Sequence, residues 1–247
     1  MCHYSGVVGN TDSPHLQTLL FQQQCQYGTL LFSFGPSIAV VYSPNSQGLF
    51  VMKFASFVVA ASVFAGTVSA ADLSAVPSGT YDVDTTHAYI RFQYNHLGLS
   101  NPTLGFEEFK MTMDLDNENP VNTKVSLDIK TDSVQTGSDI FHQHITGGKW
   151  FDAASNPNIT FNSTEVAANG DGTYDLTGDL SIKGETHPVT MKVTINAAMM
   201  HPMAGKPVVG ISAYGGLKRS QWGLGANAPY ISDDVKLEVQ AELLQRQ

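Results

Sequence analysis

The chain has 247 residues and carries 22 acidic against 13 basic residues, a formal net charge of −9 at pH 7 with histidine neutral. An acidic chain without a basic run is a poor partner for nucleic acid or for an anionic lipid surface. Its two cysteines, Cys2 and Cys25, both stand in the first 51 residues. Disulfide and thiol chemistry are therefore excluded from the rest of the chain.

The first 70 residues have the pattern of a secretory signal with an extension in front of it. Positions 1–51 contain no Lys or Arg and a single acid, Asp12. Met52-Lys53 then forms a short basic start, 54–65 is an apolar run, and 66–71 is rich in small residues. This order predicts a cleaved signal peptide over 52–70, cut after Ala70 or one residue later. A membrane anchor or a buried helix is the alternative, but a span needs about 20 apolar residues.

A signal peptide stands at the N-terminus of its protein, so 1–51 are predicted to be an upstream extension, with translation starting at Met52. The mature protein is then expected to be one domain over 71–247. We expect it to be soluble and exported, and to reside in the periplasm if the host is Gram-negative.

Alternation of apolar and polar residues dominates the mature chain. This period of two predicts strands with one apolar face. The runs are Ile90-x-Phe92-x-Tyr94, Met111-x-Met113-x-Leu115, Val125-x-Leu127-x-Ile129, Leu180-x-Ile182, Met191-x-Val193-x-Ile195 and Val235-x-Leu237-x-Val239.

Turn signals separate these runs at 117–120, 169–172, 183–185 and 215–216. Many short strands at regular spacing, without alternating helices, predict an all-β sandwich or barrel. The exception is 137–154, which is rich in Gly and His and is expected to hold a short helix or a long loop.

His142 and His144 form the most suggestive polar pair. On a strand, residues i and i+2 share a face and could hold a metal ion. Ordinary hydrogen bonding is the alternative, because no Cys/His cluster accompanies the pair. Lys218 and Arg219 could neutralise a phosphate, although only one of two adjacent strand residues can face inward. Ser220 lacks a nucleophile motif, so no catalysis is predicted.

The mature chain also carries a series of short motifs in a particular order. They are Tyr81-Asp82-Val83-Asp84-Thr85-Thr86-His87, Phe92, His96-Leu97-Gly98, Gly105-Phe106, Ser133-Val134, Trp150-Phe151-Asp152, Asn156-Pro157, Gly178-Asp179-Leu180, Lys218-Arg219-Ser220-Gln221-Trp222-Gly223 and Asp234-Val235. This order and spacing resembles the YceI-like family of periplasmic, polyisoprenoid-binding, lipocalin-like proteins. The resemblance covers about 75–244.

The resemblance implies an extended antiparallel eight-stranded lipocalin-like β-barrel around a long apolar cavity, with no catalytic activity. It implies a polyisoprenoid or isoprenoid-quinone ligand and a role in stress response. His87 and His96 would hydrogen-bond a quinone carbonyl or a diphosphate, and large aromatics would close the barrel. The expected ligand-binding residues are His87, Phe92, His96, Phe106, His142, His144, Trp150, Phe151, Arg219 and Trp222.

One stretch departs from the family pattern. Many relatives carry Arg-Asp-x-His-Leu ahead of an Asp-Phe pair. Here the corresponding run is Phe141-His142-Gln143-His144-Ile145, and the later pair is Lys149-Trp150. His144 matches and the Arg-Asp pair is lost, so the head group of the ligand is left open.

The sequence thus predicts an exported barrel that carries or sequesters an isoprenoid lipid or ubiquinone, with no other cofactor, no metal, no nucleic acid and no stable membrane insertion. Two alternatives stay open. One is a metal-dependent or redox accessory or enzyme that uses His142 and His144. The other is a structural barrel that binds protein, because small barrels are often filled by their own side chains. Each is compatible with a homodimer.

Overall fold

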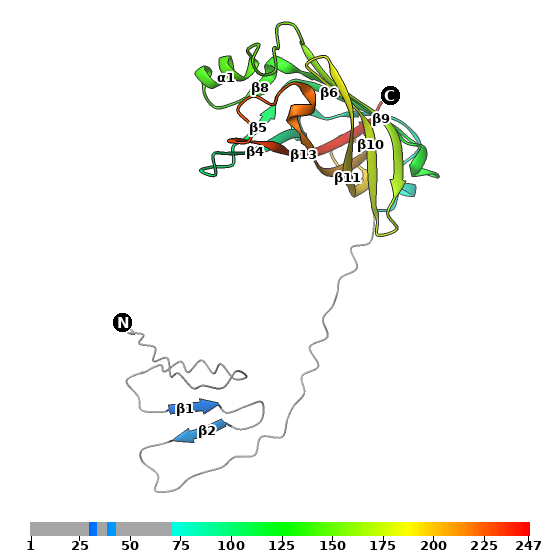
Figure 1. The fold of residues 1–247 in the computed structure, drawn as a ribbon. Helices are drawn as coiled ribbons and strands as arrows, with labels where there is room; N and C mark the ends of the chain where they lie inside the picture. The colour runs from blue at the N-terminus through cyan, green and yellow to red at the C-terminus, as the bar shows by residue number, and fades with distance from the viewer. Residues whose placement is uncertain (1–29, 34–38, 43–70) are drawn as a thin grey trace. The chain divides into compact units, whose positions relative to one another are not determined.

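The computed structural model of the chain describes residues 30–33, 39–42 and 71–247, which divide into two units (Figure 1). In the first unit, β1 (Leu30–Ser33) pairs with β2 (Ala39–Tyr42) in an antiparallel ladder. Apart from these two strands, the predicted extension over 1–51 lies outside the described residues. So does the predicted signal over 52–70 with its cleavage position at Ala70.

The second unit is built around a closed ring of eight antiparallel strands (Figure 1). Each strand pairs with the next, and the ladder between β12 and β13 closes the ring. The predicted all-β, eight-stranded barrel is therefore confirmed. In ring order the strands are β3 (Gly79–Val83), β6 (Phe109–Leu115), β7 (Lys124–Lys130), β9 (Asn158–Ala168), β10 (Thr173–Ile182), β11 (Glu185–Met200), β12 (Pro207–Lys218) and β13 (Ile231–Gln245).

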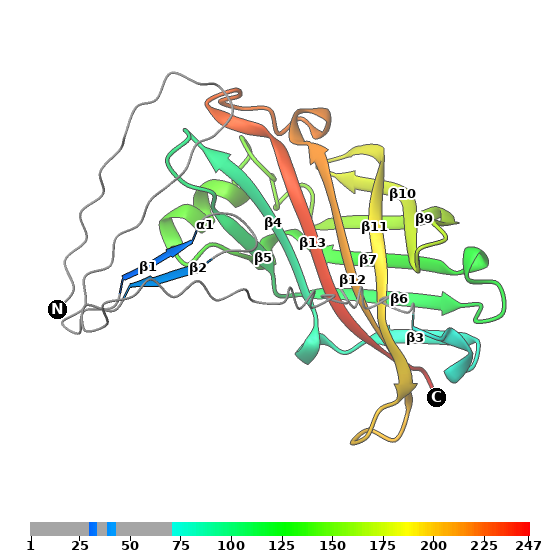
Figure 2. The same ribbon diagram turned by 90° about the horizontal axis from the view of Figure 1, so that it is seen from below.

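The sheet divides at an interruption beside β13. The short 3-10 helix η2 (Thr85–His87) separates β3 from β4 (Tyr89–His96), and both strands pair with β13. β3 continues the ring to β6, whereas β4 pairs with β5 (Thr103–Phe106), which pairs with β8 (Val134–Gln135). Figure 2 shows β4, β13, β12 and β11 running side by side.

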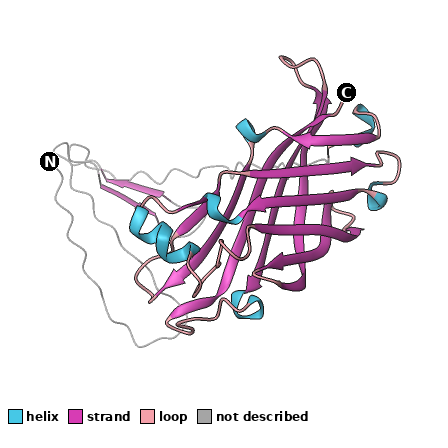
Figure 3. Ribbon diagram, turned by 90° about the horizontal axis from the view of Figure 1, so that it is seen from above, coloured by secondary structure: helices cyan, strands magenta, loops and turns pink. Residues whose placement is uncertain are grey.

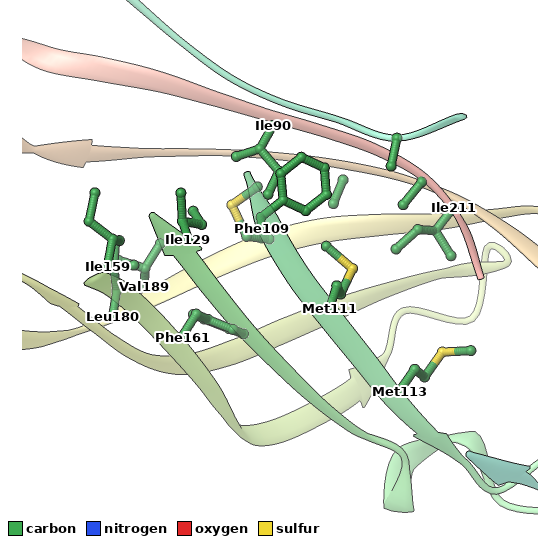
Figure 4. Close-up of a cluster of buried hydrophobic side chains, with 14 of the residues drawn as sticks. Ile90, Phe109, Met111, Met113, Ile129, Ile159, Phe161, Leu180, Val189 and Ile211 are labelled. Atoms are coloured by element: carbon green, nitrogen blue, oxygen red, sulfur yellow. The ribbon is translucent and has the colours of Figure 1, made fainter. Parts of the chain in front are cut away.

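The apolar stripes of the sequence meet inside the ring because partner residues in a ladder point to the same face. Met111 lies opposite Leu127, Met113 lies opposite Val125, and Leu127 lies opposite Phe161. Figure 4 shows side chains of β4, β6, β7, β9, β10, β11 and β12 gathered in this interior. The alternation therefore forms one continuous apolar wall.

The predicted insert at 137–154 contains one α-helix, α1 (Asp139–Thr146). Ser138 is its N-cap: the hydroxyl oxygen accepts a hydrogen bond from the backbone N–H of Phe141 at 3.4 Å. Figure 3 shows the helices as short pieces at the margins of a structure made mainly of strands. The other helices are 3-10 turns, namely η1 (Leu73–Ala75), η3 (Pro120–Asn122), η4 (Thr131–Ser133) and η5 (Arg219–Trp222).

Two of the predicted turns show why glycine alone is ambiguous. Lys183 and Gly184 form the expected tight hairpin, with φ of 51° and 82°, between the paired residues Ile182 and Glu185. The turn predicted at 215–216 is wrong, because both glycines lie inside β12. A Cβ on Gly215 would lie 2.9 Å from the carbonyl oxygen of Thr190, so this glycine permits a close approach of neighbouring strands.

A search of the described residues for a helix long and apolar enough to cross a membrane found none.

Candidate ligand-binding cavity

The interior of the barrel is not filled by its own side chains. It encloses a cavity of about 850 Å³ that is open to solvent. All six alternating runs of the sequence contribute to its lining, including the three methionines Met111, Met113 and Met191. Methionine adapts its shape to irregular surfaces, so these side chains make the wall compliant.

Three phenylalanines form a cluster in the lining. The ring centroids of Phe92 and Phe106 are 5.6 Å apart, and Phe151 lies 6.1 Å from each of them. The two contacts of Phe151 are edge-on, a favourable arrangement for aromatic rings. The structure therefore brings Phe92, Phe106 and Phe151, three of the residues predicted to bind a ligand, together in the cavity lining.

The cavity reaches the surface at one end, which we call the mouth and define as residues 96–102, 143–150 and 224–232. Apart from Arg91 on β4, the exposed lining residues all come from these segments: Ser100, Gln143, His144, Gly148, Lys149 and Asn227. The amine of Lys149 donates a hydrogen bond to Asn227 Oδ1 at 3.3 Å. His96 on β4 pairs with Ile231 on β13. These contacts join the three segments.

Arg219 is a buried cation in the cavity lining, 6 % exposed. Its Nε donates to the carbonyl oxygen of Ser232 at 2.8 Å, and its Nη2 donates to that of Ile231 at 2.7 Å. Its Nη1 donates to the carbonyl oxygens of Leu224 and Ala226. Four of its five N–H groups are thus bound to backbone of the mouth. Arg219 holds the 224–232 segment in place.

The surroundings of Arg219 are electrostatically unusual. Its guanidinium carbon lies 5.4 Å from the centre of the Trp150 ring, a cation–π contact. Burial lowers the pKa of Arg219 and raises the pKa of the neighbouring Tyr94. Among the described residues that line the cavity, none is an Asp or Glu. The charged residues that line the cavity are therefore all basic, although the protein as a whole has a negative net charge.

Only one residue of the adjacent pair Lys218 and Arg219 faces inward, as expected, although β12 ends at Lys218 and Arg219 begins η5. Arg219 lies inside, whereas Lys218 is exposed and forms an ion pair with Asp234 at 2.6 Å. A hydrogen bond and the charge of Asp234 raise the pKa of Lys218. Only Arg219 of the two faces the cavity.

The alternative of a metal ion held by His142 and His144 assumed that the two residues lie on a strand, and the structure does not support that geometry. Both residues lie on α1 and not on a strand, and residues two apart on a helix point to different sides. His144 lines the mouth. His142 lies away from the cavity lining, with Nε2 2.9 Å from the carbonyl oxygen of Asp132.

Two further residues predicted to contact a ligand lie off the cavity. Trp222 is fully buried, donates its indole N–H to the carbonyl oxygen of Leu180 at 3.0 Å, and packs edge-on against His187. His87 is exposed on η2. Neither lines the cavity. Of the ten predicted residues, the structure brings together Phe92, His96, Phe106, His144, Trp150, Phe151 and Arg219.

His87 belongs instead to a polar group on the surface. Its Nδ1 lies 3.0 Å from Asp84 Oδ2. Together with Glu242, these two side chains form a group of three that could coordinate a metal ion. Hydrogen bonds from His87 and Thr86 lower the pKa of Asp84 to about 2. The same contact raises the pKa of His87. Asp84 also caps η2 through the Thr86 N–H, which explains the contact without a metal.

Sequence reasoning missed three residues of the site. Tyr94 continues the inward stripe of Phe92, so alternation gave a signal for it. Lys149 was noted only as a departure from the family pattern, and Asn227 offered no signal. The contact between them depends on the fold of two loops that are distant in sequence.

The chain matches known proteins over the barrel. The profile of the YceI-like domain matches residues 81–243. A UPF0312 protein of Pseudomonas paraeruginosa is 34% identical over 161 residues, which cover 65% of this chain and 83% of that protein. Two solved structures are similar in fold. Burkholderia cenocepacia BcnA has a TM-score of 0.59 at 22% identity, covering 66% of this chain and 99% of that one. A polyisoprenoid-binding domain from Saccharophagus degradans has a TM-score of 0.52 at 14% identity, covering 67% and 98%.

Proposed function

The chain belongs to the YceI-like domain family, and from this premise we propose that it binds an isoprenoid lipid or isoprenoid quinone inside its barrel. The observation that carries the proposal is the continuous apolar cavity of about 850 Å³. Pockets that bind small molecules typically have volumes of about 300–1,000 Å³ and mostly apolar walls. The naming of the Saccharophagus degradans domain for polyisoprenoid binding supports the same ligand class.

The cavity volume limits the size of the ligand. If each non-hydrogen atom occupies about 30 Å³, the share of a water molecule in the liquid, the cavity accommodates roughly 28 such atoms. This corresponds to five or six isoprene units, or to a quinone ring with a shorter tail. A longer chain would extend through the mouth.

The positive mouth suits the head group. His96, His144 and Lys149 line it, and each can donate a hydrogen bond to a carbonyl or phosphate oxygen. Arg219 lies buried behind them, where a positive charge is screened less than at the surface. We therefore place the oxygen-bearing end of the ligand at the mouth and the tail among the apolar strands.

The free energy of transferring a lipid chain into the cavity suits a protein that carries or stores the lipid. Burial of one methylene contributes about 0.8 kcal/mol relative to water, so a long chain strongly prefers the cavity to water. A bilayer is as apolar as the cavity, and the net gain on transfer from it is therefore small. We propose carriage or sequestration without catalysis, after export to the periplasm and in a stress-related role. The signal pattern of 52–70 and the family resemblance support these last points.

Native mass spectrometry of protein purified from its own host, followed by lipid extraction, tests the proposal. We expect one bound lipid per barrel, of mass consistent with an isoprenoid chain. The proposal fails if no lipid co-purifies and no prenyl quinone raises the melting temperature.

Two observations speak against the premises of the alternatives. A metal or redox centre on His142 and His144 would need both side chains on one side of α1, and only His144 lines the cavity. A barrel with a filled core is contradicted by the cavity itself. Monomer and homodimer stay open as predictions.

A further inference from the structure

Four large apolar side chains are exposed around the mouth. Leu97 is 51 % exposed, Leu99 82 %, Ile140 81 % and Tyr230 74 %. Leu97 and Leu99 lie in the turn between β4 and β5, and the N–H of Leu97 donates to the carbonyl oxygen of Tyr230 at 3.0 Å. The two loop tips are therefore neighbours.

Ile140 joins this group from α1. Residues three and four apart on a helix are neighbours on its surface. Ile140 thus lies next to Gln143 and His144, which line the mouth. Figures 1 and 2 both show α1, the end of β4 and the start of β13 at the same end of the barrel.

The charge of the mouth differs from that of the protein. The chain has 22 acidic residues, yet none occurs in 92–106, 140–151 or 220–232, the three stretches that include the mouth. Lys149 is the one basic residue in these stretches. The acids Asp139 and Asp152 adjoin the second stretch, but neither lines the mouth. A mouth lined by a cation and no acid, with an apolar rim, is complementary to a lipid headgroup layer, which attracts cations and accepts apolar side chains. The rest of the protein, which carries the acidic residues, is not complementary to such a layer.

The backbone of Leu97 provides independent support. Leu97 and Gly98 have φ of 59° and 71°, and the carbonyl oxygen of His96 accepts a hydrogen bond from the Leu99 N–H at 2.9 Å. A turn with two positive φ angles favours Asn or Gly at its first central position. Leucine is unfavourable there and, half exposed, adds little to the core. A local rule broken in this way is typical of a functional position.

We infer that the mouth is a membrane-docking surface. Leu97, Leu99, Ile140 and Tyr230 enter the interface of a lipid bilayer, and the ligand passes between bilayer and cavity without crossing water. The contact is peripheral and reversible, because few side chains take part. This inference rests on the proposed lipid-binding function. An acidic chain is expected to be a poor partner for an anionic lipid surface. On this inference, that expectation holds for the rest of the protein surface but not for the mouth.

Co-sedimentation with vesicles tests the docking. The wild type is compared with the double variant L97N/L99S on vesicles of equimolar phosphatidylethanolamine and phosphatidylglycerol. We expect the double variant to bind at least about tenfold more weakly, because each apolar side chain contributes about one order of magnitude when buried. The single variant L97N should keep or raise the melting temperature, since Asn suits the turn.

The matched control is Met203→Ser. Met203 is 90 % exposed in the turn between β11 and β12, which Figure 2 shows at the end of the barrel near the C-terminus. We expect this variant to bind vesicles like the wild type. The inference is overturned if the wild type does not sediment with vesicles, or if Met203→Ser loses as much binding as L97N/L99S.

Two loading routes separate the docking from the ligand binding. Each protein is loaded with a prenyl quinone either from ethanol or from the same vesicles. We expect wild type and L97N/L99S to load equally from ethanol, and the double variant to load several-fold more slowly from vesicles. Equal rates from vesicles would overturn the docking alone, whereas no loading by either route would overturn the proposed function. A wild-type dimer that L97N/L99S converts to a monomer, without vesicle binding, would assign the rim to self-association instead.

Discussion

In the wall of the cavity, backbone groups pair from strand to strand, and the side chains that face inward are apolar. In the mouth, by contrast, much of the backbone is irregular, and the guanidinium of Arg219 accounts for carbonyl groups of Leu224, Ala226, Ile231 and Ser232. The strands of the wall form their backbone hydrogen bonds without help from any particular side chain. The backbone of the mouth, by contrast, depends on the side chain of Arg219 for hydrogen bonds.

This difference predicts different tolerance to substitution. Wall residues can be exchanged for apolar residues of similar volume at a cost below about 1.5 kcal/mol, because their role is packing. Arg219 and Trp222, by contrast, donate side-chain hydrogen bonds to specific backbone carbonyl groups. A side chain of similar volume would not replace these hydrogen bonds. Three experiments test this division and a fourth concerns a surface ion pair outside both regions, in order of decreasing expected effect.

Replacement of Trp222 should have the largest effect on stability and little effect on the ligand. Trp222 is fully buried but lies off the cavity. We expect Trp222→Ala to lower the free energy of unfolding by about 4 kcal/mol, as for other buried Trp-to-Ala changes. Urea denaturation measures this value. A matched Trp150→Ala variant should lose less stability but bind a prenyl quinone more weakly, and the reverse pattern would contradict the separation of the two tryptophans.

Arg219 and its neighbour Lys218 provide a matched pair. Arg219→Met leaves four mouth carbonyls without their donor, and we expect a loss of about 3 kcal/mol in the free energy of unfolding. Lys218→Met breaks only an exposed ion pair and should cost less than about 1 kcal/mol. Chemical denaturation of both variants compares them. Equal losses would show that Arg219 does not hold the mouth.

A larger side chain in the wall should stabilise the empty barrel and reduce its capacity. Ala213 on β12 is buried and lines the cavity. We expect Ala213→Phe to raise the stability of lipid-free protein by about 1 kcal/mol, the usual size of a cavity-filling effect. Binding of prenyl quinones should weaken, most of all for the longest tails. If Ala213→Phe instead destabilises the protein and leaves binding unchanged, the interior is already packed.

The pair Asp84 and His87 should have the smallest effect, confined to a window of pH. Asp84 has a pKa lowered from 3.8 to about 2, so its contribution is present above 3.8 and is lost as pH falls through about 2. His87 has a pKa raised above 6.5, so its contribution is present below 6.5 and is lost as pH rises through the folded value. The pair therefore stabilises most between 3.8 and 6.5.

Melting curves of His87→Ala measure this window. The variant should lose more stability relative to wild type near pH 5 than near pH 9. Thr85→Ala, an exposed neighbour in η2, is the control and should show no such dependence. A pH-independent difference would mean that the ion pair contributes nothing.

The wall could be predicted from the sequence because alternation specifies it directly. The run Met111-x-Met113-x-Leu115, like the other five, lines the cavity where the period of two placed it. The hairpin at Lys183-Gly184 was also readable from its turn residues. The turn predicted at Gly215-Gly216 was wrong, because glycine is required both in turns and where neighbouring strands approach closely.

The mouth could be predicted only in part, because its contacts join segments that are distant in sequence. A short helix or a loop was expected around His142 and His144, but the pattern did not show that the helix α1 directs the two side chains to different sides. Trp222 was placed at the ligand with Trp150, although a hydrogen bond to Leu180 holds it elsewhere. Nothing in the sequence indicates that the buried Arg219 binds carbonyl groups and not a phosphate. Only the fold brings Ser232 and Leu224 to it.

The central claim is that a lipid chain occupies the cavity, and Trp150 can report on it. The protein has two tryptophans, of which Trp150 lines the cavity and Trp222 does not. Titration of Trp222→Phe with a prenyl quinone measures quenching of Trp150 fluorescence alone. The account predicts saturable quenching at one quinone per barrel, reversed by a non-quenching prenyl alcohol and much weaker in Trp150→Phe. Quenching that is absent, or equal and non-saturating in both variants, would contradict it.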